Sequence, residues 1–184
     1  MKTKAIIIML VLLSVVSLSL ATNSNSIIDN DIEYYIQTDK SVYNLGEDVE
    51  MLFRVSNLID EDIRFDYMGP LMDFIVEEDN GEYFTEIWHW SWDQIYPDGP
   101  RVFWLLANES VELDGVWPQI NLNGSVEIED HTPVPPGTYR ISGLFTPTDI
   151  SVAVDVTVIP EPGSLSLMFF CCFYTLRTKK RTKC

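Results

Sequence analysis

Apolar and polar side chains alternate along most of residues 30–158, and this period of two residues indicates β-strands rather than helices. The clearest run is residues 151–158, in which valine occupies every second position. A run of this kind predicts a strand with one buried face and one face in solvent. Comparable runs predict further strands over residues 32–37, 49–56, 63–67, 72–77, 83–90, 102–106, 110–113 and 139–144.

Turn-forming residues separate the predicted strands. Asn80-Gly81 predicts a type I′ hairpin, and Asp98-Gly99-Pro100 and Pro135-Pro136-Gly137 mark other breaks. Short strands at a spacing of about ten residues predict an antiparallel β-sandwich, immunoglobulin-like in arrangement, over residues 31–158. The polar stretch at residues 22–30 is predicted to be a mobile leader.

The N-terminal segment has the pattern of a secretory signal peptide. Two lysines precede an apolar run from Ala5 to Leu20, and Ser19 and Ala21 provide the small residues that signal peptidase accepts. We therefore predict a signal-peptide helix over residues 1–21 that is cleaved between Ala21 and Thr22. The alternative is an uncleaved N-terminal membrane anchor.

The C-terminal segment, residues 159–184, combines three features. The motif Pro160-Glu161-Pro162 comes first, an apolar run from Leu165 to Leu176 follows, and a cluster of Arg and Lys ends the sequence. As a short hydrophobic helix the apolar run would span about 18 Å, which is less than a hydrocarbon core of about 30 Å. The basic end is expected to stay cytoplasmic, which places the body of the protein outside.

This order of features resembles the PEP-CTERM sorting signal. The resemblance implies that an exosortase-type enzyme processes the chain near the motif after transient anchoring in the membrane. It also implies delivery to the cell envelope or surface, or release from the cell. The alternative is an ordinary C-terminal anchor, and the pattern leaves open the roles of Cys171, Cys172 and Cys184.

Charge is segregated between the ends and the body of the chain. The whole chain carries 12 Lys and Arg against 28 Asp and Glu, a net charge of −16. Residues 22–160 contain 27 acidic residues against five basic ones, a balance of −22. The five basic residues are Lys40, Arg54, Arg64, Arg101 and Arg140. An acidic body argues against nucleic-acid binding, which needs clustered Lys and Arg.

The sequence contains no motif that indicates catalysis, a cofactor or a metal. His89 and His131 are not spaced as a zinc-binding H-E-x-x-H pair, and neither a G-x-S-x-G sequence nor a P-loop is present. All three cysteines lie at residue 171 or later, so the body can form neither a disulfide nor a cysteine-ligated metal site. We therefore expect a non-enzymatic protein without catalytic residues, cofactor or metal.

Three tryptophans, Trp88, Trp90 and Trp92, occupy alternate positions and would share one face of a predicted strand. Burial of large rings stabilises a sandwich that lacks disulfides, so we expect Trp88 and Trp90 in the core. The alternative is an exposed aromatic platform that stacks on sugar rings, and the position of Trp92 is compatible with either.

Several short motifs between Tyr43 and Phe145 occur in an order typical of one family. They are Phe53–Asn57, Asp73–Val76, Asn80-Gly81, Trp88–Ser91, Leu105–Val111, Trp117 and Pro136–Tyr139. The series resembles the BsuPI family, which is named for an intracellular proteinase inhibitor. The resemblance implies an immunoglobulin-like β-sandwich that binds proteins, with inhibition of subtilisin-like proteases as the activity that the name suggests. Export departs from the intracellular location of the protein that names the family.

We therefore predict an exported protein whose partner is a secreted or envelope serine protease. The candidate binding loop contains Trp92, Tyr96, Pro97 and Arg101, because loops at one end of a sandwich form binding surfaces and proline stiffens them. Residues 115–132 are a second candidate loop.

The alternative function is that of an extracellular-matrix or carbohydrate-binding module. Such a module would stack sugar rings on Trp92, Tyr96 and Trp104, and it needs a flat row of exposed aromatic rings. The exposure of Trp92, Trp104 and Trp117 therefore distinguishes the two functions.

Overall fold

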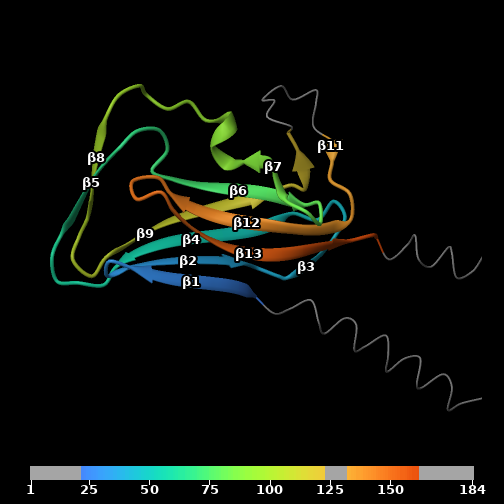
Figure 1. The fold of residues 1–184 in the computed structure, drawn as a ribbon, viewed down its shortest axis with the longest axis horizontal. Coiled ribbons are helices and arrows are strands. Elements are labelled where there is room, and N and C mark those ends of the chain that lie inside the picture. The colour runs from blue at the N-terminus through green and yellow to red at the C-terminus, as the bar shows by residue number, and fades with distance from the viewer. Residues whose placement is uncertain (1–21, 123–131, 162–184) are drawn as a thin grey trace, which may run out of the picture.

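All of the predicted strands form, and most of them build two facing sheets (Figure 1). The computed structural model describes residues 22–122 and 132–161, so the predicted terminal helices, the cysteines, Ala21, His131 and Pro162 lie outside the described residues. The first sheet has the order β1 (Asn23–Asp29), β2 (Ile32–Thr38), β4 (Val49–Asn57) and β9 (Ser110–Trp117). The second sheet has the order β3 (Val42–Asn44), β13 (Ile150–Ile159), β12 (Gly137–Phe145), β6 (Met72–Asp79) and β7 (Phe84–His89).

Three smaller elements complete the described fold. A two-stranded ribbon consists of β5 (Ile63–Tyr67) and β8 (Arg101–Leu105), and a short pair consists of β10 (Ile120–Asn121) and β11 (Thr132–Pro133). A single 3-10 turn, η2 (Trp90–Asp93), follows β7.

The core lies between the two sheets because the buried face of each strand carries the apolar residues of the alternation. Large and small residues oppose each other across it. Phe53 of β4 faces Gly143 of β12, and Phe74 of β6 faces Gly115 of β9. The two rings also contact each other edge to face, with centroids 6.5 Å apart. The fold is therefore a β-sandwich whose layers interdigitate closely.

The ribbon covers one end of the sandwich (Figure 1). Its inner face packs on Phe145, the last residue of β12, since the Phe65 ring meets the Phe145 ring edge to face at 5.1 Å. The Phe103 ring lies 6.5 Å from the same ring. We call this end, where β5 and β8 lie, the ribbon end.

The opposite end of the sandwich, which we call the basal end, is where β13 finishes. β13 runs from Ile150, paired with Phe145 at the ribbon end, to Ile159 at the basal end. Its ten residues span about 30 Å at the usual rise of a strand. β1 also begins at the basal end, because the Asn23 side chain donates to the Asp155 carbonyl at 2.7 Å.

The stretch predicted as a mobile polar leader is in fact strand β1. It pairs with β2 through a two-residue turn at Asn30 and Asp31, whose φ angles of 48° and 62° are those of a type I′ turn. A second side-chain amide, that of Asn25, donates to the Ala153 carbonyl of β13 at 3.0 Å. β1 shows no apolar alternation because it is an edge strand with mostly exposed side chains, held by backbone pairing and these amides.

Three other details differ from the sequence prediction. The pairing is not wholly antiparallel, because β3 runs parallel to β13. The connection from β6 to β7 is a four-residue loop from Asn80 to Tyr83, in which Gly81 rather than Asn80 has positive φ, so it is not a type I′ turn. Finally, the strand over residues 83–90 ends at His89, so the tryptophans do not share one strand face.

Across the described residues, no helix is both long enough and apolar enough to cross a membrane.

Candidate functional site

The segment that joins η2 to β8, residues 94–100, forms an arch beside the ribbon end (Figure 1). At its start, Gln94 has extended backbone angles, φ −100° and ψ 142°, and its N–H donates to the Ser91 carbonyl at 3.0 Å. The next residue, Ile95, is 98% exposed. The arch therefore presents an aliphatic side chain to solvent directly after a fixed turn.

Arg101 fixes the other side of the arch. Its Nη2 donates to the Pro97 carbonyl at 3.0 Å. Its guanidinium also lies over the rings of Tyr96 and Tyr67, 5.8 Å from each centroid, a cation–π arrangement. One side chain thus connects the arch to the last residue of β5.

A buried carboxylate, that of Asp73 on β6, holds the turn from which the arch begins. Asp73 is 4% exposed, and it accepts the Ser91 N–H at 3.0 Å and the Ser91 hydroxyl at 2.5 Å. The carboxylate therefore acts as an N-cap supplied from a neighbouring strand, satisfying an N–H that a short helix leaves open. A buried acid is retained here because its oxygens are satisfied by these bonds.

His89 lies between two carboxylates at the same place. Its Nδ1 is 3.3 Å from Asp73 Oδ2, and its Nε2 is 3.1 Å from Glu86 Oε2. Burial disfavours the charged imidazole, but the bonds to these two carboxylates outweigh it and raise the pKa of His89. The Trp92 ring stacks on the imidazole at 4.5 Å. The group is no catalytic triad, because Ser91 donates to the aspartate rather than to the histidine.

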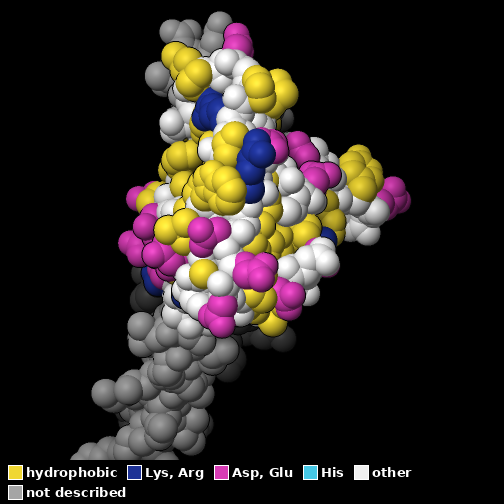
Figure 2. Space-filling model, turned by 90° about the vertical axis from the view of Figure 1, so that its left-hand side faces the viewer, with side chains coloured by type: hydrophobic (Ala, Val, Ile, Leu, Met, Phe, Trp, Pro, Cys, Tyr) yellow, Lys and Arg dark blue, Asp and Glu magenta, His cyan; other side chains and the backbone are white. Residues whose placement is uncertain are grey.

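The outer face of the ribbon is exposed. Trp104 is 53% exposed and Val102 is 50% exposed, and across the strands they pair with Arg64 and Asp66, which form an ion pair at 2.6 Å. Figure 2 shows hydrophobic side chains gathered on this end, with basic side chains among them and acidic ones around them. Within residues 22–122 and 132–161, six of the 11 exposed large hydrophobic residues belong to the ribbon and its connections: Leu58, Met68, Ile95, Val102, Trp104 and Leu106.

The ribbon is attached to the sandwich through Asn57, the last residue of β4, which is 2% exposed. The Asn57 amide donates to the carbonyls of Glu61, Leu105 and Leu106 at 2.7, 3.2 and 3.1 Å. Its Oδ1 accepts the N–H of Ile59 at 3.1 Å. One side chain therefore joins the connection before β5 and the end of β8 to the first sheet.

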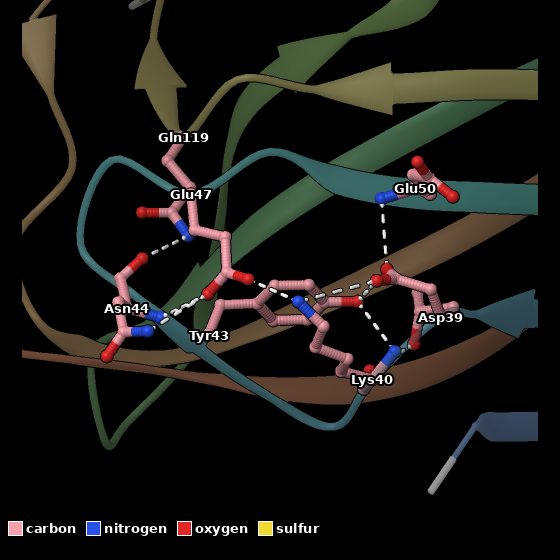
Figure 3. A network of polar contacts seen from close by, with 8 residues as sticks. Asp39, Lys40, Tyr43, Asn44, Glu47, Glu50 and Gln119 are labelled. Atoms are coloured by element: carbon pink, nitrogen blue, oxygen red, sulfur yellow. Dashed lines mark hydrogen bonds and ion pairs between the residues drawn. The ribbon is translucent and has the colours of Figure 1, made fainter. Parts of the chain in front are cut away.

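A second polar network lies at the basal end, between β2 and β4 (Figure 3). The Tyr43 hydroxyl donates to Asp39 Oδ1 at 2.6 Å and accepts the N–H of Lys40 at 3.0 Å. Asp39 Oδ1 also accepts the N–H of Glu50 at 3.1 Å. Burial, together with the bond to Asp39, raises the pKa of Tyr43, so the phenol remains a donor.

The same network continues to Gln119, which is 1% exposed. The Gln119 side chain accepts the N–H of Gly46 at 2.7 Å and donates to the Asn44 carbonyl at 3.0 Å. The Glu47 carboxylate accepts hydrogen bonds from the Lys40 ammonium and from the N–H of Asn44. The hydrogen bond from Lys40 lowers the pKa of Glu47. These groups satisfy one another and hold β3 beside β13, which is a structural role (Figure 3).

The candidate residues from the sequence divide into two groups. Tyr96, Pro97 and Arg101 come together in the arch as described above. Trp92 belongs instead to η2, where its ring stacks on His89 and is only partly exposed. Sequence reasoning missed Ile95, for which the available signal was a lone aliphatic residue in a segment otherwise rich in turn residues. Of the second candidate loop, residues 123–131 lie outside the described part of the chain.

The five tryptophans, some predicted to lie in the core and others chosen to distinguish protease binding from sugar binding, differ in exposure. Trp88 is 7% exposed and lies in the core as predicted, whereas Trp90 is only partly buried and packs against the core. Trp117 is fully buried and Trp92 is stacked, so Trp104 is the exposed indole among Trp92, Trp104 and Trp117. These side chains do not form the flat exposed row that a sugar-stacking surface needs.

The family model described as "BsuPI: Intracellular proteinase inhibitor" matches residues 36–149, more than half of the chain. The chain belongs to the BsuPI family. No curated protein matches this sequence. The BsuPI family is an inhibitor family, typically non-enzymatic.

Two of the BsuPI motifs owe their spacing to one contact. Asp73, which begins the motif Asp73–Val76, binds Ser91, which ends the motif Trp88–Ser91. A third motif ends at Tyr139, whose hydroxyl donates to the Pro135 carbonyl four residues upstream at 2.5 Å, as in the tyrosine corner of immunoglobulin-like domains. Burial raises the pKa of Tyr139 to about 12.

Solved structures similar to the BsuPI sandwich are remote in sequence. A β-glucosidase from Listeria innocua is 14% identical with a TM-score of 0.41, over 70% of this chain and 16% of that one. A β-glucosidase from Erythrobacter marinus is 9% identical with a TM-score of 0.42, over 76% and 15%. A CARDB domain from Pyrococcus furiosus is 19% identical with a TM-score of 0.38, over 70% and 94%. The chain thus spans about a sixth of the glucosidases it matches.

Proposed function

We propose that this protein binds a secreted or envelope serine protease of the subtilisin-like class and slows it, using the ribbon end as the binding surface. The observation that carries the proposal is the arch, which is tied at Gln94 on one side and by Arg101 on the other. A loop that is already ordered loses little conformational entropy on binding, and this is what protease inhibitors require.

The surface around the arch supports protein binding. Exposed apolar side chains that gather in one place and are surrounded by polar residues are typical of a protein-binding surface. Trp104 and Arg64 lie opposite each other on the ribbon, and Trp and Arg are residue types that dominate binding energy at interfaces. The carbohydrate-binding alternative is less well supported, because it needs a row of exposed rings.

The test is to titrate a panel of secreted serine proteases with the purified full-length chain in detergent. At least one protease should lose activity at micromolar concentration while the chain stays intact, since a bound inhibitor resists digestion. If every protease keeps its activity and digests the chain, the protein is not an inhibitor.

The proposal also includes export and sorting. Pro160 and Glu161 are exposed and follow β13 directly, so a processing enzyme such as an exosortase could reach them. Because β13 ends at the basal end, a C-terminal segment held in the membrane would leave the ribbon end about 30 Å further out, facing away from the bilayer. The protease could then reach the arch whether or not the protein is released from the membrane.

Replacing Pro160-Glu161-Pro162 by three alanines should leave the chain uncut and retained in the membrane, because the processing enzyme would lose its recognition motif. Intact-mass measurement and cell fractionation check this. A variant with the same mature mass and the same distribution as the parent protein would exclude the sorting-signal hypothesis. Thr22 would be the first residue of the mature chain in both proteins if the signal peptide is cut after Ala21.

A further inference from the structure

We propose that Ile95 is the side chain that enters the primary specificity pocket of the bound protease, and that the partner is therefore a serine protease whose pocket accepts a branched aliphatic side chain. This inference rests on the proposed function and adds to it the contact residue and the specificity class. It is carried by the exposure of Ile95 combined with the fixed backbone on both sides of it.

Exposure alone does not select Ile95, because single exposed aliphatic residues are common on protein surfaces. Ile95 differs from Ile28 and Val116 in its location, because those two lie within strands β1 and β9 and Ile95 lies in a connecting segment. It differs from the exposed aliphatic residues of the other connections in its degree of exposure: Ile95 is 98% exposed, against 64% or less for Leu58, Met68 and Leu106. A side chain can fill the pocket of another protein only if its whole surface is accessible.

The backbone around Ile95 is extended, as a protease requires of a bound chain. Gln94 before it has φ −100° and ψ 142°. Tyr96 after it precedes Pro97, and a residue before proline is restricted to extended conformations. Gly99 has positive φ, 111°, and reverses the chain beyond this stretch. The angles of Gln94 and the restriction on Tyr96 favour a short extended segment over residues 94–97, before the reversal at Gly99.

The contacts on both sides of Ile95 hold this segment in place. The Gln94 N–H is bonded to η2, which is itself fixed by Asp73, and the Pro97 carbonyl accepts a bond from Arg101. The Arg101 guanidinium lies over the Tyr96 ring. Fixed residues on both sides of a freely exposed one would let Ile95 enter a pocket without reorganisation of the loop, which favours inhibition over rapid cleavage.

The chemistry of the side chain defines the partner. Isoleucine fits an apolar pocket of moderate depth, and the carboxylate-lined pocket of a trypsin-like enzyme selects Arg and Lys instead. Transfer of a fully exposed isoleucine into an apolar pocket accounts for about 10- to 150-fold in affinity. The wild-type chain should therefore inhibit proteases that cut after aliphatic residues and leave trypsin-like enzymes unaffected.

The experiment uses the full-length chain in detergent with two proteases, one that cuts after aliphatic residues and one trypsin-like. Ile95→Asp should weaken inhibition of the first enzyme at least about 30-fold, because a carboxylate is not accepted in an apolar pocket. Ile95→Arg should lose inhibition of the first enzyme and gain inhibition of the trypsin-like one. Val116→Asp and Val116→Arg are the matched controls, since Val116 is also an exposed aliphatic residue but lies at the basal end of β9, paired with Glu50.

The outcomes separate the two proposals. If the wild-type chain inhibits and both Ile95 variants inhibit as strongly, Ile95 is not the contact residue, although the inhibitor function stands. If Ile95→Arg is simply cut by the trypsin-like enzyme without slowing it, the arch is a substrate and the inference is wrong. If no form of the chain inhibits either enzyme, both proposals fail. Unchanged thermal unfolding shows that the variants fold, as expected for a side chain that is 98% exposed.

Discussion

Replacing Gly143 by alanine is expected to lower the free energy of unfolding by about 3 kcal/mol, because the new methyl group has no space. A Cβ at Gly143 would lie 2.4 Å from two carbon atoms of the Phe53 ring, and that ring is completely buried. This change in the free energy of unfolding has the opposite sign to the usual one, because Gly→Ala in a strand normally stabilises a protein by about 0.5–1 kcal/mol. Denaturant unfolding followed by tryptophan fluorescence measures the difference.

The control for this prediction lies in the same strand. A Cβ at Gly137 would meet its nearest neighbour, the Tyr139 ring, at 3.8 Å, an ordinary contact. Gly137→Ala should therefore show the usual effect and raise the free energy of unfolding by up to about 1 kcal/mol. Adding Phe53→Leu to Gly143→Ala should recover part of the loss, because the two residues occupy one space. Equal stability of the two alanine variants would contradict the interdigitated core.

Replacing Asn57 by leucine is expected to lower the free energy of unfolding by about 3–4 kcal/mol and to detach the ribbon from the first sheet. The substitution removes the amide that donates to three carbonyls and the oxygen that accepts the Ile59 N–H. The Leu106 carbonyl keeps its bond from the Glu109 N–H, so the groups that lose this partner are the Glu61 and Leu105 carbonyls and the Ile59 N–H. A buried polar group left without a partner costs about 1–3 kcal/mol. Leucine has a similar volume, so loss of packing contributes little.

Two measurements check the role of Asn57. Denaturant unfolding gives the loss of stability, and hydrogen exchange shows where it occurs: residues 58–67 and 101–107 should exchange faster than the sheets. Asn25→Leu is the matched control, because Asn25 is exposed and makes a single bond to β13, and it should cost less than about 1 kcal/mol. A uniform rise in exchange over the whole sandwich would show that Asn57 does not act on the ribbon in particular.

Strands with an alternating pattern could be predicted from the sequence, and strands that are mostly exposed or very short could not. The valines of β13 alternate because one of its faces lies in the core, so its period was visible. β1 is mostly exposed, and β3 and β10 have only three and two residues, so none of them has a period to detect. The alternating tryptophans gave a misleading signal, because a 3-10 turn, held by the distant Asp73, begins after His89.

The candidate site could be predicted only in part, because some of its features follow from local sequence and others from long-range contacts. Proline and the neighbouring turn residues marked the arch, so Tyr96, Pro97 and Arg101 were found from local sequence. The role of Asn57 depends on carbonyls as much as 49 residues away, and the exposure of Ile95 depends on how the arch leaves η2. Contacts of this kind are set by the tertiary fold and leave no local pattern.

The central claim is that the ribbon end binds the protease, and hydrogen exchange of the complex tests it most directly. The full-length chain is measured alone and with the protease that it inhibits most strongly, in a form whose catalytic serine has been replaced by alanine. The account predicts slower exchange over residues 94–106 and 58–67 and no change in the basal network over residues 38–50 (Figure 3). Protection over residues 38–50, with residues 94–106 unchanged, would contradict it.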